Sequence, residues 1–599
     1  MRRGIWGGIV VLALLVAGAP PALAETVVEE RAQRERRALP LARLFDNRAV
    51  SDDAEPGAAD FDGSGASLSA RDLVAAGWLP GRSLSIDAAR LRLPDWEPGK
   101  PDNMLADGQL VRVRGRGTAL SFLVAGTGGT ARGRGRVRYA DGSVSAFRLT
   151  APDWRSGPRA AQAVTLPHIN TRGGKRAERA RLYVVSVPLA ADRQVTSVQL
   201  PRASGGADLH VFAVSVRAAA TGWTGTWSAS SSGYAAVGPW TDRTLRLVVR
   251  TSVGGPRVRV RLDNTFAGLP VRIGSASVAV RAAGAGARQR PVPLSFDGRR
   301  GTEIPAGAQA FSDPLGFDVP ADSDLLVSFH LPDTVAAAPV HHRAAQRSYL
   351  SEPGDHTADG APDAYTSTLS TWPFLTGVEV GGGPGSVVTL GDSITDGVGS
   401  TPDTNRRWPN VLARRLLAQD EVPHYGVLNH GISANRVVSD VYPGDGVSRS
   451  TGGVSALHRL ERDVLAQPSV RTVVVFEGIN DLRWGATADQ VTAGLREIAV
   501  RARERGLRVV GATLVPCEGE ARCTAAVDAE RAAVNAYLRG PAVSGAVFDA
   551  VLDFDAVLRD PTRPARLLPA YDSGDHLHPG DAGLAALADA VDPRVLRAG

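Results

Sequence analysis

The sequence predicts a multidomain protein with two N-terminal β-rich, sandwich-like modules and a C-terminal α/β domain with a mostly parallel sheet. Three observations predict this fold class. The chain has 599 residues, which is enough for several domains. Its 66 glycines and 39 prolines indicate many turns and short strands. After residue 385, apolar runs of strand length alternate with helical patterns up to the C-terminus.

The N-terminus has the features of a secretory signal peptide over residues 1–24. Arg2 and Arg3 precede a short apolar stretch, and Ala22-Leu23-Ala24 forms a small-x-small cleavage site. An uncleaved membrane anchor is the alternative, but the apolar run is short for a span of about 20 residues. We therefore expect a secreted, extracellular protein without stable membrane insertion after cleavage. Residues 25–42 form a charged leader to which we assign no chemistry.

Composition argues against a nucleic-acid partner. The net charge is +6, and lysine occurs only at Lys100 and Lys175, so the basic residues are almost all arginine. Abundant Ala, Gly and Arg are typical of codon usage in a GC-rich genome. No dense basic cluster interleaved with aromatic residues is present. We expect a monomer that binds no nucleic acid.

The two cysteines, Cys517 and Cys523, are separated by five residues. Their even number, close spacing and predicted export favour one local disulfide. Two free thiols are the alternative.

Residues 43–215 are expected to form a β-sandwich, because short apolar alternations recur there between Gly, Pro, Asp and Asn turns. The stretch 61–81 resembles β-sandwich modules attached to secreted carbohydrate-active enzymes, which implies a sugar-binding or spacer role. Trp78, Trp96 and Trp154 are candidates for stacking on sugars, although a tryptophan in a β-sandwich is more often part of the core. The expected strands are 109–113, 119–124, 135–139, 181–187 and 208–216.

Residues 216–384 are expected to form a second β-rich domain that ends in a glycine-rich linker. The adjacent pair His341-His342 lacks a third ligand at metal-binding spacing, so we predict no metal site there. The expected strands are 244–252, 257–262, 276–281 and 324–331.

Residues 385–599 alternate strands and helices, which indicates a doubly wound, mostly parallel sheet. In such sheets the reactive groups lie beyond the carboxyl ends of the strands. The expected strands are 386–390, 425–429, 473–476, 508–515 and 550–554. The expected helices are 405–419, 453–465, 487–505, 521–538 and 582–590.

Four short blocks of this predicted domain carry candidate reactive groups. An apolar strand leads into Ser393 and places its hydroxyl near backbone amides. Gly431 follows the second strand, and a glycine amide can approach a reacting oxygen closely. Asn480 follows the third strand and can direct its side-chain NH2 at the same point. Asp575 and His578 precede the last helix. The chain has no G-x-S-x-G pentapeptide, which argues against an ordinary α/β-hydrolase.

These four blocks, in this order, resemble the GDSL or SGNH hydrolase family, whose four letters correspond here to Ser393, Gly431, Asn480 and His578. The resemblance covers residues 385–599. It implies a three-layer, flavodoxin-like α/β domain and an esterase that hydrolyses carboxylic esters through an acyl-enzyme.

The resemblance also implies a role for each residue. Ser393 is the nucleophile, His578 is the general base and Asp575 orients the imidazole. The backbone amides of Ser393 and Gly431 and the side chain of Asn480 are expected to form the oxyanion hole. This chemistry requires no metal and no cofactor.

Neighbouring residues offer alternatives for some of these roles. His576 competes with His578 as the base, and the family register favours His578. Asp392 and Asp396 are also acids near the nucleophile, but we expect them to bind backbone amides and shape the turn. Asp481 is expected to orient the loop of Asn480.

The leading hypothesis for function is a secreted esterase that deacetylates a carbohydrate such as an acetylated polysaccharide. An N-terminal module that binds the polymer would raise the effective substrate concentration. A lipase or lysophospholipase is the alternative within enzymes and would need an apolar acyl channel. A non-catalytic carbohydrate-binding surface protein is the alternative of another class, and the intact Ser393, Asp575 and His578 argue against it.

Overall fold

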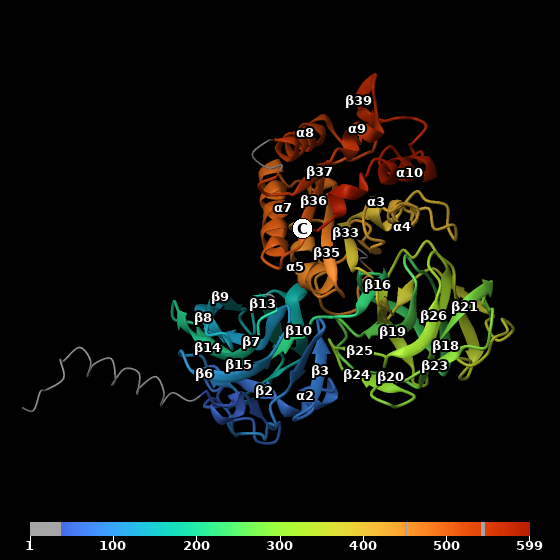
Figure 1. The fold of residues 1–599 in the computed structure, drawn as a ribbon. Helices are drawn as coiled ribbons and strands as arrows, with labels where there is room; N and C mark the ends of the chain where they lie inside the picture. The colour runs from blue at the N-terminus through green and yellow to red at the C-terminus, as the bar shows by residue number, and fades with distance from the viewer. Residues whose placement is uncertain (1–37, 191, 450–451, 541–544, 599) are drawn as a thin grey trace, which may run out of the picture.

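The computed structural model describes residues 38–190, 192–449, 452–540 and 545–598 (Figure 1). The predicted signal peptide and residues 25–37 of the leader lie outside the described residues. Within the described ranges, no helix is both long and apolar enough to cross a bilayer. The C-terminal domain lies against two β-rich regions, drawn in blue to teal and in green to yellow.

The first β-rich region is a sandwich. One sheet has the strand order β10-β13-β7-β15-β5 and the other the order β6-β14-β8-β9. Alternate residues of each strand point inward, and Phe122, Val137 and Val198 meet in the shared core. The strands are β5 (Met104–Leu105), β6 (Leu110–Gly115), β7 (Ala119–Thr127), β8 (Ala131–Tyr139), β9 (Val144–Ala151), β10 (Gln162–Leu166), β13 (Ala180–Pro188), β14 (Val195–Ser204) and β15 (Asp208–Arg217).

A small sheet and a short helix lie beside this sandwich. The sheet order is β1-β2-β11-β12, and the helix α2 (Ala70–Ala75) follows β2 directly. Ser69 caps the helix by accepting a hydrogen bond from the amide of Asp72. The strands are β1 (Val50–Ser51), β2 (Ser67–Ser69), β11 (Ile169–Thr171) and β12 (Gly174–Arg176).

The three tryptophans considered as sugar platforms belong to the core. Trp78 and Trp154 are 1% exposed and Trp96 is 8% exposed. The indole of Trp78 donates to the carbonyl of Ala306, which lies in the second β-rich region, at 2.9 Å. None of these three rings presents a face on which a sugar can stack.

The second β-rich region also contains two large sheets. One has the order β16-β32-β19-β25-β3-β4 with β26 beside β19, and the other the order β22-β21-β27-β18-β29-β30 with β23 beside β21. Their strands are β16 (Trp223–Ser228), β18 (Arg243–Arg250), β19 (Gly255–Asp263), β21 (Ser275–Ala283), β22 (Gly286–Ala287), β23 (Val292–Leu294), β25 (Gln309–Phe311), β26 (Leu315–Val319), β27 (Asp324–Leu331), β29 (Ser348–Pro353), β30 (Ser367–Leu369) and β32 (Leu375–Gly381).

Smaller strand groups complete this region. They form the sheets β17-β28-β31 and β20-β24. The strands are β17 (Gly233–Trp240), β20 (Val271–Ile273), β24 (Thr302–Ile304), β28 (Val335–His341) and β31 (Trp372–Pro373).

The boundary at 215/216 does not separate the two β-rich regions completely. The hairpin β3 (Ser83–Ile86) and β4 (Ala89–Arg92) comes from the first region but extends a sheet of the second, where Gln309 pairs with Ser85. One continuous hydrophobic core therefore joins the two regions.

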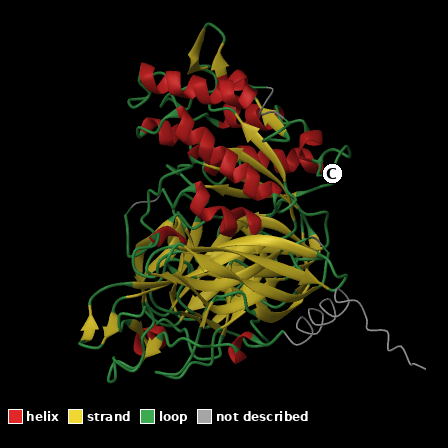
Figure 2. Cartoon of the chain, turned by 90° about the vertical axis from the view of Figure 1, so that its left-hand side faces the viewer, coloured by secondary structure: helices red, strands yellow, loops and turns green. Residues whose placement is uncertain are grey.

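The C-terminal domain is a three-layer α/β domain, as the sequence predicts (Figure 2). Its five strands have the order β34-β33-β35-β36-β37 and all pairs are parallel. The helices α4 and α10 cover one face, while α5, α7 and α8 cover the other. The strands are β33 (Ser386–Gly391), β34 (Gly426–Gly431), β35 (Val470–Phe476), β36 (Arg508–Ala512) and β37 (Ala550–Leu552).

The helices agree with the expected ranges to within a few residues at most ends. Four further short elements, α3, α6, α9 and η4, follow strands or precede the C-terminus, and the expected helix 453–465 is divided into α5 and η3. The helices are α3 (Ser393–Asp396), α4 (Trp408–Leu417), α5 (Ala456–Leu460), the π-helical turn η3 (Glu461–Leu465), α6 (Ile479–Arg483), α7 (Ala488–Arg503), α8 (Ala525–Arg539), α9 (Phe554–Leu558), α10 (Asp581–Asp589) and η4 (Pro593–Leu596). The hairpin β38 (Arg559–Asp560) and β39 (Arg563–Leu567) follows α9.

The second β-rich region packs directly on this α/β domain. Its strand β16 contacts the edge strand β34. The amide of Gly225 donates to the hydroxyl of Ser386 at 3.0 Å, and the amide of Val427 donates to the hydroxyl of Ser252 at 3.0 Å. The β-rich region therefore forms part of the support for the sheet that carries the candidate site.

Candidate active site

Ser393 lies where β33 passes into the short helix α3. Asp392 caps this helix, and its carboxylate accepts a hydrogen bond from the amide of Ile394 at 3.0 Å. As the first residue of the helix, Ser393 has a backbone N–H without an intrahelical partner. Burial raises the pKa of Asp392 to about 7. Asp392 therefore shapes the turn around the nucleophile, as expected from the sequence.

The structure brings Ser393, His578 and Asp575 into one hydrogen-bonded chain. The hydroxyl of Ser393 lies 2.8 Å from Nε2 of His578. Nδ1 of His578 lies 2.6 Å from Oδ2 of Asp575, whose Oδ1 accepts the amide of His578 at 2.8 Å. Burial raises the pKa of Asp575, but the hydrogen bonds from His578 outweigh it, so the net shift is downward. The carboxylate thus stays ionised beside the imidazole.

His576 does not take part in this chain. Its Nδ1 lies 2.7 Å from Oδ2 of Asp572, and its side chain is half exposed. Its backbone is left-handed, with a φ of +65°. The ring packs against Gly519, where a Cβ would lie 2.9 Å from it. The two histidines thus form separate pairs with two different aspartates.

Asn480 is held at the start of α6 by bonds to both ends of its amide. Its Nδ2 donates to the carbonyl of Asn435 at 3.0 Å, and its Oδ1 accepts from Arg483 at 3.0 Å. One N–H of the side chain is left for another acceptor. Asp481 binds the amides of Val437 and Val438 at 2.8 and 3.0 Å, so it fixes the loop after β34 beside Asn480.

Gly431 does not have the role that the family resemblance implies, which is to donate its amide to the oxyanion. Its amide donates to Oδ1 of Asn429 at 2.9 Å, so it is already bound within its own strand end. Nδ2 of Asn429 donates in turn to the carbonyl of Thr395 at 2.8 Å. A Cβ at position 431 would overlap the backbone of Asp396. The glycine therefore allows the second strand to approach α3 closely.

Three residues further along, Ala434 adopts the left-handed conformation with φ +64°. The amide of Ser433 before it donates to Asp396, and the amide of Asn435 after it donates to Ile432. Within the part of the chain that the structure describes, the amide of Ala434 has no hydrogen-bond acceptor. The sequence gives no sign of this conformation, because alanine does not favour positive φ.

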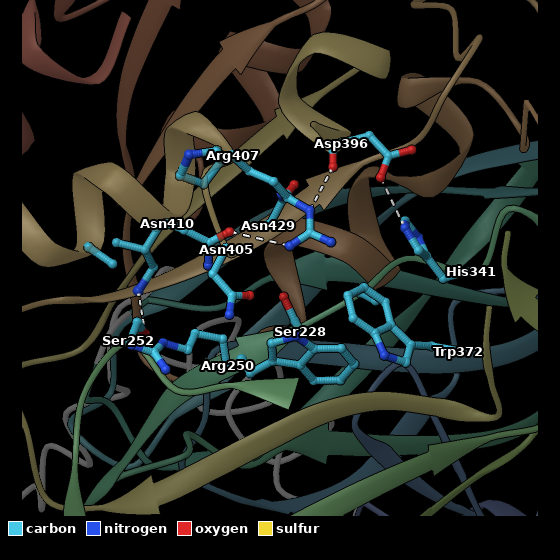
Figure 3. A pocket seen from close by; sticks show the side chains of 15 residues that line it. Ser228, Arg250, Ser252, His341, Trp372, Asp396, Asn405, Arg407, Asn410 and Asn429 are labelled. Carbon is cyan, nitrogen blue, oxygen red and sulfur yellow. Dashed lines mark hydrogen bonds and ion pairs between the residues drawn. The ribbon is translucent and has the colours of Figure 1, made fainter. Parts of the chain in front are cut away.

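Asp396, at the end of α3, joins the active-site loops to the β-rich region. Its carboxylate accepts the amide and hydroxyl of Ser433 at 2.9 and 2.5 Å. Its other oxygen lies 3.0 Å from Nε2 of His341, at the end of β28 (Figure 3). Arg407 donates to the carbonyl of Asp396 at 3.0 Å and to the carbonyl of Ala344. The sequence predicted the turn-shaping role of Asp396 but not its partner His341.

A second buried group crosses the same junction. His430 lies between the hydroxyls of Ser228 and Ser230, at 2.9 and 2.8 Å. Burial lowers its pKa to about 3, so the ring is neutral. Arg459 is fully buried and donates to the carbonyls of His430 and Gly391 at 2.7 and 3.0 Å. These residues fix the carboxyl ends of β34 and β33.

The cavity drawn in Figure 3 lies at this junction, and it is too small for a substrate. Its volume is about 30 Å³, which can hold about one or two water molecules. It is lined by Trp227 and Trp372 from the β-rich region and by Arg407 and Asn410 from the α/β domain. The cavity belongs to the packing beneath α3.

The predicted disulfide between Cys517 and Cys523 is present. Both sulfur-bearing side chains pack with Ile479 and Leu577 in a small hydrophobic cluster. Leu577 directly precedes His578. The disulfide loop thus supports the segment that carries the histidine.

Residues 389–586 match the family described as GDSL-like Lipase/Acylhydrolase. The C-terminal domain belongs to this family. The match spans the GDSL domain from the strand before Ser393 to the last helix after His578. No curated protein matches the chain.

Solved structures resemble the GDSL domain over about a third of the chain. A protein described as lipolytic and of the G-D-S-L family, from Desulfitobacterium hafniense DCB-2, is 21% identical, with 35% of this chain and 99% of that chain covered and a TM-score of 0.27. TesA is 23% identical, with 35% and 96% covered and a TM-score of 0.25. The acetylxylan esterase Axe2 from Geobacillus stearothermophilus is 22% identical, with 34% and 91% covered and a TM-score of 0.26.

Proposed function

We propose that the protein is a secreted serine esterase that removes acetyl groups from a carbohydrate through an acyl-enzyme. The observation that carries the proposal is the continuous chain from the hydroxyl of Ser393 through His578 to Asp575, with distances of 2.8 and 2.6 Å. A nucleophile, a base and an orienting acid within hydrogen-bond reach are the requirement for this chemistry.

In the proposed mechanism, Oγ of Ser393 attacks the ester carbonyl while Nε2 of His578 takes its proton. The tetrahedral intermediate then collapses, the bond to the alcohol breaks, and His578 returns the proton to the leaving alkoxide. A water molecule, deprotonated by His578, attacks the acyl-enzyme, the bond between the acyl carbon and Oγ breaks, and His578 returns the proton to Oγ as the acid leaves. Asp575 holds the imidazole in the required tautomer and stabilises the imidazolium.

We assign the oxyanion hole to three N–H donors: the amides of Ser393 and Ala434 and the side chain of Asn480. Among the residues that the structure describes, the amide of Ser393 has no hydrogen-bond acceptor, as expected for the first residue of a helix. Asn480 keeps one N–H free after its bond to Asn435, and Ala434 has a free amide on the same loop. In this scheme Ala434 replaces Gly431, whose amide is occupied by Asn429.

Secretion and a carbohydrate substrate are supported by features outside the triad. The signal-peptide pattern at residues 1–24 and the disulfide Cys517–Cys523 are consistent with an oxidising compartment. The two β-rich regions occupy more than half of the chain and contribute no residue to the Ser393–His578–Asp575 chain. A large non-catalytic part is expected when an enzyme must reach a polymer.

Acetate release from a panel of acetylated glycans, with acetyl and long-chain 4-nitrophenyl esters in parallel, tests this proposal. Ser393→Ala is expected to lower kcat by at least ~10³-fold while the protein still folds. Faster hydrolysis of the long-chain esters than of the acetyl esters would indicate a lipase and not a deacetylase. Equal turnover by Ser393→Ala and the wild type would overturn the esterase assignment altogether.

A further inference from the structure

An exposed tryptophan lies next to the candidate active site. Trp484 directly follows α6, the helix that carries Asn480, and is 45% exposed. It is one of few large apolar side chains on the surface of the described residues. Three guanidinium groups surround its ring: the centroid lies 4.9 Å from Cζ of Arg436, 5.2 Å from that of Arg483 and 4.5 Å from that of Arg522.

These arginines come from three different segments at one edge of the sheet. Arg436 follows β34, Arg483 lies on α6 after β35, and Arg522 lies in the disulfide loop after β36. Because all strands are parallel, these segments meet at the carboxyl edge, where Ser393 follows β33. The positive cluster and the nucleophile therefore share one rim.

Direct contacts connect the cluster to the reacting groups. Arg483 donates to Oδ1 of Asn480 at 3.0 Å. Arg436 is next to Asn435, whose carbonyl accepts the amide of Asn480. The disulfide that closes the loop of Arg522 packs on Leu577, the neighbour of His578. A group bound at the cluster thus lies beside the residues that handle the ester.

The cluster carries more positive charge than its neighbours neutralise. Glu520 pairs with Arg483 at 2.6 Å. The carboxylate of Asp481 attracts Arg436 electrostatically, and its two oxygens accept hydrogen bonds from backbone amides. Among the described residues, Arg436 and Arg522 have no carboxylate within 4.0 Å, and Nε of Arg436 is buried without a hydrogen-bond partner. Arg522 is exposed and Arg436 is partly exposed, so this excess positive charge is open to an anionic ligand.

We propose that Arg436, Arg483 and Arg522, held around Trp484, form a subsite for a carboxylate on the alcohol part of the ester. The planar guanidinium fork matches a carboxylate, and the exposed indole adds an apolar surface for the ring that carries it. An acetyl group has no charge, so the anion belongs to the alcohol. The substrate class is therefore an acetylated acidic glycan, such as a polyuronate, and this inference rests on the proposed function.

Two esters that differ by one carboxylate test the subsite. The neutral ester is 2-nitrophenyl acetate and the anionic ester is 3-acetoxy-4-nitrobenzoate. The ratio of kcat/KM for the anionic over the neutral ester is expected to fall about tenfold in Arg436→Gln and in Arg522→Gln, and to fall in the wild type as salt rises. Arg496→Gln is the matched control, because Arg496 is an exposed arginine in the middle of α7 and does not belong to the cluster. It is expected to leave the ratio unchanged.

Binding of 3-hydroxy-4-nitrobenzoate to the Ser393→Ala protein, measured by calorimetry, is independent of turnover. Weaker binding in Arg436→Gln and Arg522→Gln, but not in Arg496→Gln, supports the subsite even if neither ester is hydrolysed. Absence of hydrolysis of both esters would overturn the esterase proposal but not the subsite. Equal binding and equal ratios in all variants would overturn the subsite, while hydrolysis of the neutral ester would still support the esterase.

Discussion

Nε2 of His341, at the end of β28, lies 3.0 Å from Oδ1 of Asp396, the last residue of the helix that begins with Ser393. Both side chains are buried, with exposed fractions of 6% and 3%. The other oxygen of Asp396 holds Ser433, in the loop that carries Ala434. One ion pair therefore links the β-rich region to the nucleophile helix and to the oxyanion loop together.

Breaking this pair should affect both stability and catalysis. His341→Ala leaves the carboxylate of Asp396 buried with one partner fewer, which is expected to cost about 3 kcal/mol of unfolding free energy. The value of kcat is expected to fall as well, because Asp396 orients Ser433. Thermal unfolding and ester turnover measure the two effects. The neighbouring exposed His342→Ala is the control, and equal behaviour of the two variants would contradict the linkage.

The pair also predicts a pH dependence. Burial lowers the pKa of His341, but Asp396 outweighs burial and the net shift is upward from 6.5. Arg407 and His342 face the same imidazole and oppose this shift. Because the folded pKa lies above the unfolded one, the stabilisation is fully present below about pH 6.5 and is lost as pH rises through the folded pKa.

The pKa of Asp396 is shifted downward, since His341 outweighs its burial, so the same pair persists below the usual carboxyl value of 3.8. We therefore expect the Tm difference between the wild type and His341→Gln to be large at pH 5–6 and to shrink towards pH 9. Measurements of Tm for both proteins from pH 5 to pH 9 check this prediction. A difference that grows with pH would show that the imidazole is neutral in the folded protein.

Local sequence patterns place the expected strands well, because each needs only alternating or continuous apolar residues, but many short strands of the β-rich regions carry no such signal. The strand expected over 324–331 is present as β27 (Asp324–Leu331). The hairpin 83–92, by contrast, pairs with Gln309 across more than 200 residues. No local pattern identifies such a partner, so the sequence places a boundary at 215/216 that this pairing crosses.

The same limit applies to the site. The motifs identified Ser393, Asp575 and His578, because each follows a recognisable strand or precedes a helix. His341 contacts Asp396 only through the docking of two domains, and the adjacent histidines give no signal of this. Gly431 looked like an oxyanion donor because it is a glycine after a strand, but its neighbour Asn429 occupies its amide.

Asn480→Ala is expected to lower kcat by about 10²–10³-fold with little change in KM, because its free N–H is proposed to act only on the oxyanion. Steady-state kinetics with an acetyl ester measure both constants. Asn480→Asp, of equal size, should be at least as slow, since it replaces a donor by an acceptor. A change confined to KM would show that Asn480 binds substrate and does not stabilise the transition state.

Substitutions at 431 and 434 should have opposite effects on stability. Gly431→Ala forces a methyl group into the backbone of Asp396 and is expected to cost about 1–3 kcal/mol. Ala434→Gly relieves a left-handed conformation and is expected to gain up to about 1 kcal/mol while kcat is kept, because the backbone amide remains. Chemical denaturation and kinetics of both variants check this. Loss of stability in Ala434→Gly would contradict the relief of strain.

The disulfide should matter more for turnover than for the fold. Cys517 and Cys523 close a loop with a sequence separation of 6, for which loop entropy predicts about 2 kcal/mol of stabilisation. The same loop packs on Leu577 and so supports His578.

In the double variant Cys517→Ser/Cys523→Ser we expect a small decrease in Tm but a fall in kcat of about tenfold. Thiol titration, Tm and kcat, each measured with and without dithiothreitol, separate the two effects. Dithiothreitol should lower the kcat of the wild type to that of the double variant. It should leave the kcat of the double variant unchanged. An unchanged kcat in the double variant would mean that Leu577 keeps the histidine in place without the disulfide.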